Sequence, residues 1–209
     1  MSKLNEISEK LQQGKANDVK VLVEAEIKAG TPVRDILNKG LIAGMGVIGA
    51  KFKKNEVYVP EVLIAARAMH AGLSVLEPHL AAAGVKPVAK VGIGTVKGDL
   101  HDIGKNLVAM MLRGAGFEVV DLKIDCSADK FVQAAKDGCQ LLCLSALLTT
   151  TMPQMKSVIE ALKVAKVKVP VLIGGAPVTQ SYSDEIGAQG YAPDAASAVD
   201  VAKKMLKIK

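Results

Sequence analysis

The residues best suited to chemistry lie in one short segment, GDLHDIGKN, which spans residues 98–106. His101 stands there between Asp99 and Asp102, after an apolar run typical of a strand and before one typical of a helix. A histidine in such a loop is most often exposed to solvent or satisfied by a neighbour. Asp99 favours another reading, because a carboxylate on one ring nitrogen fixes the tautomer and makes the other nitrogen a better metal donor. The segment therefore marks His101 as a candidate metal ligand.

The sequence offers little to complete an ordinary metal site around this histidine. The other two histidines, His70 and His79, lie in the other half of the chain. Zinc needs about four ligands, and nothing near His101 supplies them. A metal bound by His101 would have to arrive with most of its ligands attached. A macrocycle-bound metal meets this condition and leaves the protein one axial position.

The glycines around this segment could instead indicate a nucleotide-binding α/β domain. Gly92, Gly94 and Gly98 are spaced as GxGxxxG, however, and not as the dinucleotide fingerprint GxGxxG. Asp99 and Asp102 would add negative charge beside a pyrophosphate, and no Walker lysine with a following Ser or Thr is present. The segment is a poor fit for a nucleotide phosphate.

The second half of the chain, residues 89–209, alternates strand-length apolar runs with helical segments. The runs are apolar on both faces, as in a parallel sheet that is covered on both sides. We expect an α/β fold with a doubly wound, Rossmann-like or flavodoxin-like sheet of about five strands. The expected strands are residues 90–96, 117–124, 141–147, 169–175 and 190–193.

Unusual residues gather where these strands end, and ligands of such sheets bind outside the carboxyl ends of the strands. Four hydroxyl side chains lie at the end of the third strand or just after it, namely Ser145, Thr149, Thr150 and Thr151. Gly174 and Gly175 end the fourth strand and remove side chains where a ligand or another chain must approach the backbone. A histidine–carboxylate loop, a hydroxyl cluster and a diglycine are thus expected at one edge of the sheet.

The first half of the chain, residues 1–88, is predicted to be a four-helix bundle. The expected helices are residues 4–14, 16–30, 31–52 and 60–84, with Thr31 as an N-cap and Pro32 at the first helical position. Glycines cost helix stability, so those of the third helix indicate close packing by another helix or by a ligand: Gly40, Gly44, Gly46 and Gly49. The segment GVKPVAK, residues 84–90, reads as a short linker.

Composition and charge argue against several function classes. The formal net charge of +6 is spread evenly, without a basic run or stripe, which disfavours nucleic acid as the main partner. The charged start MSKLNEISEK is unlike a signal peptide, and no run of about 18 uncharged apolar residues predicts a membrane span. The three cysteines, Cys126, Cys139 and Cys143, lack metal-type CxxC spacing. Their odd number and their place in or near apolar runs predict buried, reduced thiols in a cytoplasmic protein.

Several motifs resemble one known family. DLHDIG resembles the DxHxxG motif of cobalamin-binding domains, and SALLTT and the later GG stand where that family has its SxL and GG signatures. The segment FKKNEVYVPEVLIAARAMHAGLSVLEP resembles the cap bundle of methylcobalamin-carrying proteins. Over nearly its whole length the chain is similar to the small corrinoid proteins of anaerobic methyltransferase systems, and to the cobalamin-binding module of methionine synthase.

This resemblance implies a cobalamin bound base-off and His-on, with His101 ligating cobalt in place of the cofactor's own dimethylbenzimidazole. It implies a ligand triad of His101, Asp99 and Thr151, where methionine synthase modules have Ser in the third position. Phe52 and Val59 match cap residues that shield the methyl group, although ordinary bundle core is an alternative reading. The other implied cofactor contacts are Gly92, Gly94, Gly98, Leu100, Asp102, Ile103, Gly104, Ser145, Leu147, Thr149, Gly174, Gly175, Tyr191, Asp194 and Ala195. Asp102 could instead cap a helix that begins near Ile103.

The function implied by the resemblance is that of a methyl carrier, in which cobalt alternates between cob(I)alamin and methylcobalamin. The implied partners are a substrate-specific methyltransferase, an acceptor methyltransferase and a reductive activase. The donor class would be methanol, a methylamine, betaine or a methoxylated aromatic, and the acceptor a tetrahydrofolate-type pterin or a thiol. Residues 1–88 would form a cap over the cobalamin-binding domain of residues 89–209, with the linker as a hinge.

Two related functions compete with the carrier. A small cobalamin subunit of an adenosylcobalamin mutase would need a barrel on a separate subunit to hold substrate over cobalt. A cobalamin-dependent sensor or regulator shares the bundle and the α/β domain, but usually adds a DNA-binding helix-turn-helix and a tryptophan in the bundle. The sequence has no Trp and no spare basic module before the bundle.

Overall fold

The computed structural model describes residues 3–208. The chain folds as two compact units. The first consists of the residues up to Pro87 together with Gly114–Gly116, and the second of Val88–Arg113 and the residues from Phe117 onward. The separate roles expected for a cap and a cobalamin-binding domain stay predictions.

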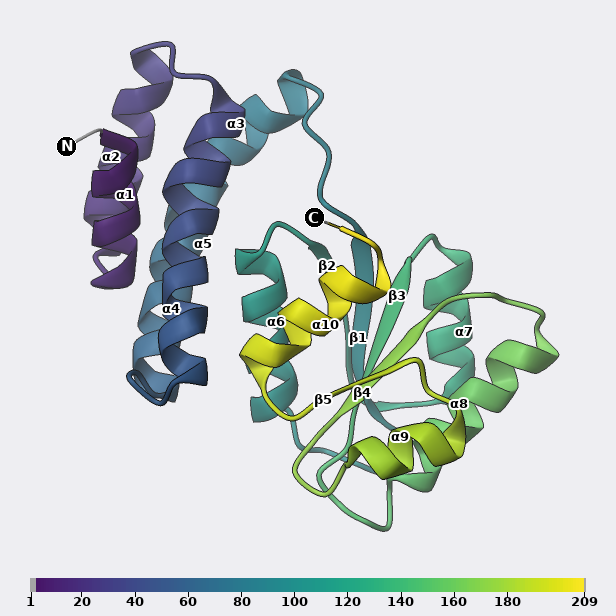
Figure 1. Ribbon diagram of the computed structural model, residues 1–209. Coiled ribbons are helices and arrows are strands. Elements are labelled where there is room, and N and C mark those ends of the chain that lie inside the picture. The colour runs from purple at the N-terminus through teal and green to yellow at the C-terminus, as the bar shows by residue number, and fades with distance from the viewer. Residues whose placement is uncertain (1–2, 209) are drawn as a thin grey trace. The chain divides into compact units, whose positions relative to one another are not determined.

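The first unit is helical, as Figure 1 shows in purple and blue. Its elements are α1 (Lys3–Gln12), α2 (Ala16–Lys28), α3 (Val33–Asp35), the π-helix η1 (Ile36–Ile42), α4 (Ala43–Lys53) and α5 (Val59–Ala82). The helix expected over residues 31–52 is therefore one continuous path that changes from α to π and back. The expected N-cap was wrong, because Pro32 holds that position and the Thr31 hydroxyl donates to Glu26 Oε2 at 2.7 Å.

Two glycines of this long helical path make room for α1. A Cβ on Gly40 would lie 3.1 Å from Cγ2 of Ile7, and one on Gly44 would lie 3.0 Å from the carbonyl oxygen of Ser8. A Cβ on Gly46 would meet nothing within 4 Å. Tight contact between helices thus explains Gly40 and Gly44 without a ligand.

Substituting Gly44→Ala is expected to lower the free energy of unfolding by about 1–3 kcal/mol, because its Cβ would press on the backbone of α1. Gly46→Ala is the matched control, since the added methyl group enters open space and alanine has the higher helix propensity. The control should stabilise the protein by up to about 1 kcal/mol. Urea unfolding of both variants measures the difference, and equal effects would contradict the packing explanation.

Within residues 3–208, one helix, α5, is long and apolar enough by length and composition to cross a membrane. A core helix of a soluble bundle passes the same test. Eight residues of α5 are buried, among them Ala65, Met69 and Leu76, and the helix packs against α2 and α4. These contacts give its apolar residues partners inside the bundle.

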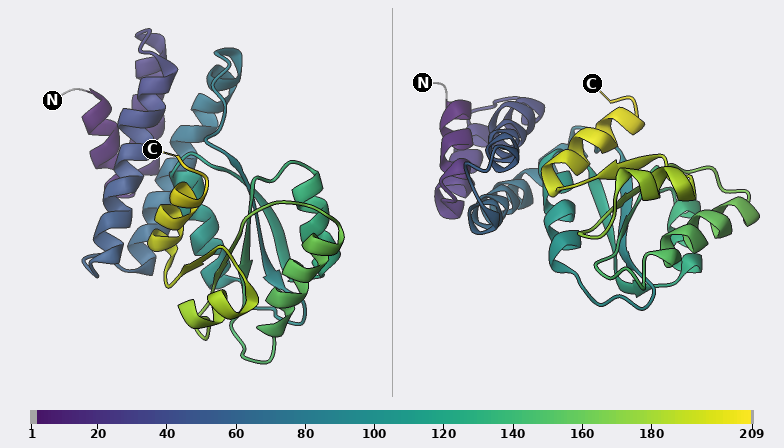
Figure 2. Two further views of the ribbon diagram at one scale, coloured as in Figure 1. Left: turned by 45° about the vertical axis from the view of Figure 1, so that its right-hand side comes forward. Right: turned by 60° about the horizontal axis from the view of Figure 1, so that its bottom comes forward.

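The second unit contains a five-stranded parallel sheet of order β2-β1-β3-β4-β5. The strands are β1 (Lys90–Val96), β2 (Glu118–Cys126), β3 (Leu141–Ser145), β4 (Val171–Gly174) and β5 (Gly190–Ala192). The helices α6 (Ile103–Gly114) and α10 (Ala195–Met205) cover one face, and α7 (Ala128–Lys136), α8 (Pro153–Val164) and α9 (Gln180–Ile186) cover the other, as Figures 1 and 2 show. The predicted fold class is confirmed, and the strand order is the flavodoxin-like one.

Gly92 and Gly94 have a packing role inside this sheet. A Cβ on Gly94 would lie 2.9 Å from the ring of Phe131, which is fully buried on α7. One on Gly92 would lie 3.0 Å from Leu142. Both glycines thus lie within β1, away from its carboxyl end, and leave room for the protein's own core. Packing thus accounts for these two glycines, and their contact with a cofactor stays a prediction.

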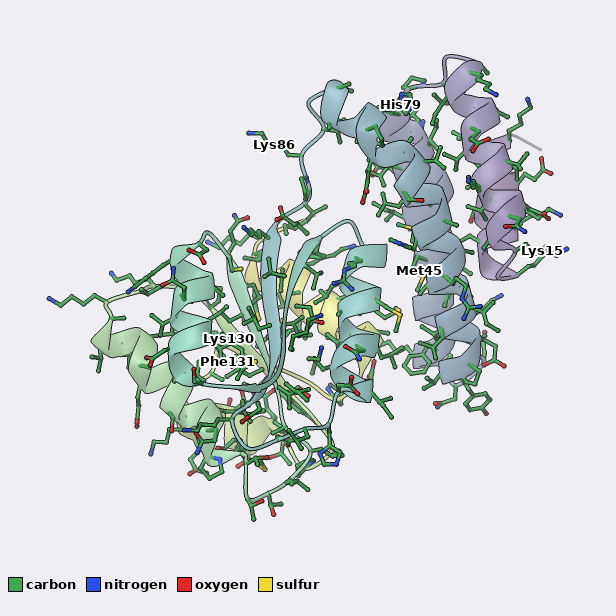
Figure 3. The ribbon with its side chains drawn as sticks, turned by 180° about the vertical axis from the view of Figure 1, so that it is seen from behind. Lys15, Met45, His79, Lys86, Lys130 and Phe131 are labelled. Carbon is green, nitrogen blue, oxygen red and sulfur yellow. The ribbon has the colours of Figure 1, made fainter. Side chains whose placement is uncertain are left out.

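The segment that joins the two units runs between the end of α5 and the start of β1. It has no regular structure from residue 85 to residue 87. Lys86 projects from it into solvent (Figure 3). The linker expected at residues 84–90 therefore lies where the chain leaves the bundle, although its last residue already belongs to β1.

Candidate functional site

The candidate site lies at the carboxyl edge of the sheet. β1 has β2 on one side and β3 on the other, so the connections after β1 and β3 leave in opposite directions. Such a switch point is where open α/β sheets bind ligands. The loop after β1, residues 97–102, and the loop after β3, residues 146–152, meet there through the side chain of Asp99.

Asp99 is fully buried and joins these two loops. Its Oδ1 accepts from the backbone N–H of His101 at 3.0 Å and lies 2.8 Å from His101 Nδ1. Its Oδ2 accepts from the N–H of Leu147 and the hydroxyl of Thr151, both at 2.8 Å, and from the N–H of Leu148 at 3.3 Å. The predicted set of His101, Asp99 and Thr151 is thus brought together.

The protonation of this cluster follows from the contacts of Asp99. Burial alone would raise the pKa of its carboxyl group, but the hydrogen bonds from Leu147, His101 and Thr151 hold that pKa well below its usual value. An ionised carboxylate only accepts hydrogen bonds, so Nδ1 of His101 carries the proton. In the tautomer with its proton on Nδ1, the lone pair is on Nε2. Half of the His101 side chain, 51%, is exposed to solvent.

The Thr151 hydroxyl lies between two acceptors, because Oδ2 of Asp99 is at 2.8 Å and the carbonyl oxygen of Leu148 at 2.9 Å. A hydroxyl has one hydrogen and can donate to only one of them at a time. Thr151 is buried. It can therefore strengthen or weaken its bond to Asp99 without any other side chain moving.

Large apolar side chains of the His101 loop, the loop after β3 and the start of α6 are exposed to solvent. The exposed fractions of Leu100 and Ile103 are 67% and 79%, and those of Leu147 and Leu148 are both 43%. Exposed apolar side chains gathered on two neighbouring loops and at the start of α6 are typical of a surface that binds an apolar ligand. Sequence reasoning missed Leu148, although it follows Leu147 directly in the SALLTT motif.

Glycines shape the backbone around this surface. Gly98 has a φ of 79° and donates its N–H to Oδ1 of Asp125 at 2.7 Å. Gly175 has a φ of 134°, and a Cβ there would overlap the carbonyl group of Ala146. A Cβ on Gly104, in the first turn of α6, would meet nothing within 4 Å, so that position stays open. Asp125 was also missed, because it comes from β2 and carries no motif.

Asp102 opens α6. Its carbonyl oxygen accepts the N–H of Asn106 at 2.7 Å, and its carboxylate accepts the side-chain amide of Asn106 at 2.9 Å. The helix begins at the next residue, Ile103. Asp102 thus lies directly before the helix, and its contact with a corrin stays a prediction.

The remaining predicted residues lie in several places. Ser145 ends β3 and pairs with both Thr95 and Gly174, and Thr149 is exposed on the following loop. Tyr191 is in β5, and Asp194 uses its carboxylate to cap α10 through Ser197, just before the buried Ala195. Phe52 and Val59 are half-buried in α4 and α5 of the first unit.

The described residues hold no alternative metal site. Across residues 3–208, no group of three or more His, Cys, Asp or Glu side chains is placed to hold a metal ion. The cysteines are free and buried. Burial raises the pKa of each thiol, that of Cys143 to about 12. A thiolate ligand is therefore not available from these residues, and the imidazole of His101 stays the candidate donor.

Known proteins are similar to this chain in sequence and in fold. The B12 binding domain family matches residues 89–200, and a second family with the same description matches residues 3–77. A corrinoid protein of Desulfitobacterium hafniense (strain Y51) is 39% identical over 212 residues, which cover 99% of this chain and 98% of the relative. Dimethylamine corrinoid protein 1 of Methanosarcina mazei is 42% identical over 207 residues, with coverages of 97% and 95%. The crystal structure of the methanol:cobalamin methyltransferase complex MtaBC from Methanosarcina barkeri matches with a TM-score of 0.89 and 31% identity, over 98% of this chain and 80% of that chain.

Proposed function

Because the chain belongs to the B12-binding corrinoid proteins of methyltransferase systems, we propose that it carries a methyl group on the cobalt of a bound corrinoid. One arrangement carries the proposal. Nδ1 of His101 is bound to a buried, ionised Asp99, and Nε2 is left with a lone pair in an exposed ring. A single imidazole with no further metal ligands fits a metal that brings its own macrocycle.

The residues around His101 fit the underside of such a macrocycle. The exposed side chains of Leu100, Ile103, Leu147 and Leu148 offer an apolar floor. Gly98 and Gly104 keep that floor free of side chains next to His101. We propose that the cofactor binds base-off and His-on, with its nucleotide tail following the carboxyl edge past Ser145, Gly174, Gly175, Tyr191 and Ala195.

The bound cobalt would supply the nucleophile that accepts the methyl group and the carbon–metal bond that holds it. The protein's own part is to hold and release the lower ligand. While Nε2 donates its lone pair, the ring must stay neutral, with its proton on Nδ1 and that proton directed at Asp99. When Nε2 is released, the ring can take a second proton, whose charge Asp99 balances. The Thr151 hydroxyl can follow this change by donating either to Asp99 or to the carbonyl of Leu148.

The helical unit is proposed to act as the cap. Phe52 and Val59 would shield the methyl group, and the irregular linker would let the cap move away so that a partner enzyme can reach cobalt. The partners would be a donor methyltransferase, an acceptor methyltransferase that serves a tetrahydrofolate-type pterin or a thiol, and a reductive activase. Support comes from the methanol system, whose solved structure is a complex of a corrinoid protein with its methyltransferase. Free, reduced cysteines agree with a cytoplasmic location.

We propose a methylated amine as the donor class. Dimethylamine and trimethylamine corrinoid proteins are each 42% identical to the chain, over 97% and 87% of its length. The test is to reconstitute the protein with cobalamin, reduce it, and add purified methylamine-specific or methanol-specific methyltransferases with their substrates. Methylation, followed by the absorbance of the cofactor, should be fastest with an amine-specific enzyme, by a factor of ten or more. A faster reaction with methanol would overturn the donor assignment, and no methylation by any donor enzyme would overturn the carrier function.

A further inference from the structure

A second set of polar contacts holds the loop that carries His101, independently of the Asp99 carboxylate. The N–H of Gly98 donates to Oδ1 of Asp125 at 2.7 Å, and the N–H of Asp125 donates to the carbonyl of Asp99 at 3.1 Å. The carbonyl of His101 accepts the hydroxyl of Thr95 at 2.8 Å. The backbone is therefore fixed on both sides of Asp99 and again at His101 itself.

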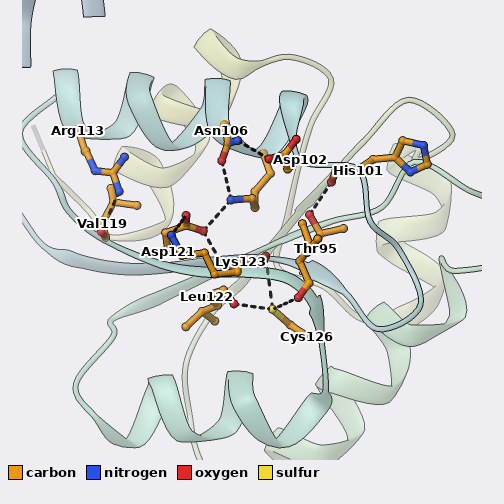
Figure 4. Close-up of polar contacts among 12 residues, drawn as sticks. Thr95, His101, Asp102, Asn106, Arg113, Val119, Asp121, Leu122, Lys123 and Cys126 are labelled. Carbon is orange, nitrogen blue, oxygen red and sulfur yellow. Dashed lines mark hydrogen bonds and ion pairs between the residues drawn. The ribbon is translucent and has the colours of Figure 1, made fainter. Parts of the chain in front are cut away.

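Thr95 is placed so that its hydroxyl reaches only the backbone of the ligand residue. It lies in β1, is fully buried, and points to the carbonyl of His101, while the imidazole ring extends away from it (Figure 4). The N–H of the same residue is held by Asp99 Oδ1. Both peptide groups that flank the His101 Cα thus have fixed partners, and only the side-chain torsions are left to move the ring.

Asp125 owes its position to an irregular end of β2. Lys123 and Asp125 have φ values of 74° and 50°, and the pairing of β1 with β2 shifts register at this point. A left-handed conformation is costly for residues other than glycine and persists only where the surroundings enforce it. Asp121 stabilises the left-handed conformation of Lys123, because Oδ1 of Asp121 accepts the N–H of Lys123 at 2.9 Å.

Asp121 is held in turn by a buried lysine. Lys105 on α6 is 2% exposed, and its ammonium group lies 2.7 Å from Asp121 Oδ1 and from Asn106 Oδ1. Burial would raise the pKa of Asp121, but the hydrogen bonds from Lys105 and Lys123 lower it to about 2. A buried charge is tolerated only with close partners. The pair ties the first turn of α6 to the strand end that supports the His101 loop.

From these contacts we infer that Thr95 is a positioning residue for the cobalt ligand, and that Asp125 acts with it by holding the preceding turn. The inference rests on the proposed function. The two residues keep the His101 backbone in one place before the cofactor binds, so that Nε2 reaches or leaves cobalt by rotation of the ring alone. Preorganisation of this kind favours the ligated state, because less ordering accompanies binding.

The test compares Thr95→Val with Thr95→Ser. Valine keeps the shape but leaves the buried carbonyl of His101 without a donor, whereas serine keeps the hydroxyl. In the cofactor-free protein, hydrogen exchange of the peptide that covers residues 97–104 should accelerate at least fivefold in Thr95→Val. In the methylcobalamin-loaded protein, the ratio of His-on to His-off absorbance should fall roughly fivefold, the effect of losing about one net hydrogen bond. Thr95→Ser should stay within twofold of the original protein in both measurements.

A second variant keeps the inference testable if Thr95→Val does not fold. Asp125→Gly removes the acceptor of the Gly98 N–H at a left-handed position that glycine tolerates, and Lys123→Gly is its matched control at a neighbouring left-handed residue. Faster exchange and a lower His-on ratio are expected for Asp125→Gly only. The positioning role is overturned if Thr95→Val equals Thr95→Ser, and Asp125→Gly equals Lys123→Gly, in both exchange rate and His-on ratio. The proposed function still stands in that case, provided that the unsubstituted protein is His-on. If the unsubstituted protein takes up no corrinoid in the His-on form, both fail.

Discussion

Replacing His101 with glycine is expected to abolish the His-on absorption spectrum of bound methylcobalamin completely. The chain's other two histidines, His70 and His79, belong to α5 of the helical unit and not to the cobalamin-binding loops. The corrinoid should still bind, since the apolar floor and the glycine-lined edge stay in place, but with its lower axial position open to water. Absorption spectroscopy of the reconstituted variant measures both results.

Two controls make this result specific to the ligand position. His79→Gln changes an exposed histidine on α5 and should leave the spectrum as it was. Free imidazole added to His101→Gly should restore part of the His-on spectrum, because the removed ring was half exposed and its site stays accessible. A His-on spectrum in His101→Gly without added imidazole would show that another residue is the ligand.

Replacing Asp99 with asparagine is expected to damage both the fold and the ligand. Each carboxylate oxygen accepts hydrogen bonds, Oδ1 from the N–H and the ring of His101 and Oδ2 from Leu147 and Thr151. An amide has one oxygen, so its NH₂ group must face N–H donors in either orientation. The free energy of unfolding should fall by about 2–5 kcal/mol, because buried donors lose their acceptor. The His-on fraction should also fall, because the proton on Nδ1 loses its charged partner.

The pH dependence of stability gives a second measure of Asp99. Its pKa is lower in the folded protein than in the unfolded chain, so its contribution is present above the unfolded pKa of about 3.9 and is lost as the pH falls below that value. The unsubstituted protein should therefore lose stability between about pH 5 and lower pH more steeply than Asp99→Asn. Asp102→Asn, which changes an exposed carboxylate only three residues away, is the matched control for unfolding measurements. Equal acid sensitivity of Asp99→Asn and the unsubstituted protein would contradict the central place of Asp99.

The layered fold was predictable because the spacing of apolar residues along the sequence indicates which faces of helices and strands are buried. The run of residues 90–96 became β1 without a change of boundary, and the expected sheet of five parallel strands is present. The observed ends of helices differ from the expected ones where hydrogen bonds, and not burial, determine where a helix begins or ends. Thr31 looked like an N-cap, but its hydroxyl instead donates to Glu26, which lies five residues earlier on α2.

The site was predictable only where its residues are close in sequence or belong to a motif. Asp99 and His101 are two residues apart, so their contact follows from local geometry. Thr151 is fifty-two residues from Asp99, and only the resemblance to a known family connected them. Gly94 is a different case, because a glycine can make room for a ligand or for the protein's own core, and the ring of Phe131 lies 2.9 Å from where its Cβ would be.

Asp125 could not have been found from sequence in any of these ways. Its position depends on two left-handed residues and a register shift in β2, which in turn depend on the buried pair of Lys105 and Asp121. No pattern of burial or spacing encodes such a chain of contacts. Leu148 is different, because its exposure follows from its place in the SALLTT loop beside Leu147, and attention to exposed apolar residues after a strand would have found it.

The most direct measurement of the central claim is electron paramagnetic resonance of the reconstituted protein with its cobalt in the Co(II) state. An axial nitrogen of natural isotope splits the cobalt lines into triplets, and nitrogen-15 splits them into doublets. Protein labelled with nitrogen-15 in histidine alone, loaded with unlabelled cobalamin, should give doublets, and these should vanish in His101→Gly. Triplets from the histidine-labelled protein would show that the cofactor's own base is the ligand, and would contradict the assignment of His101.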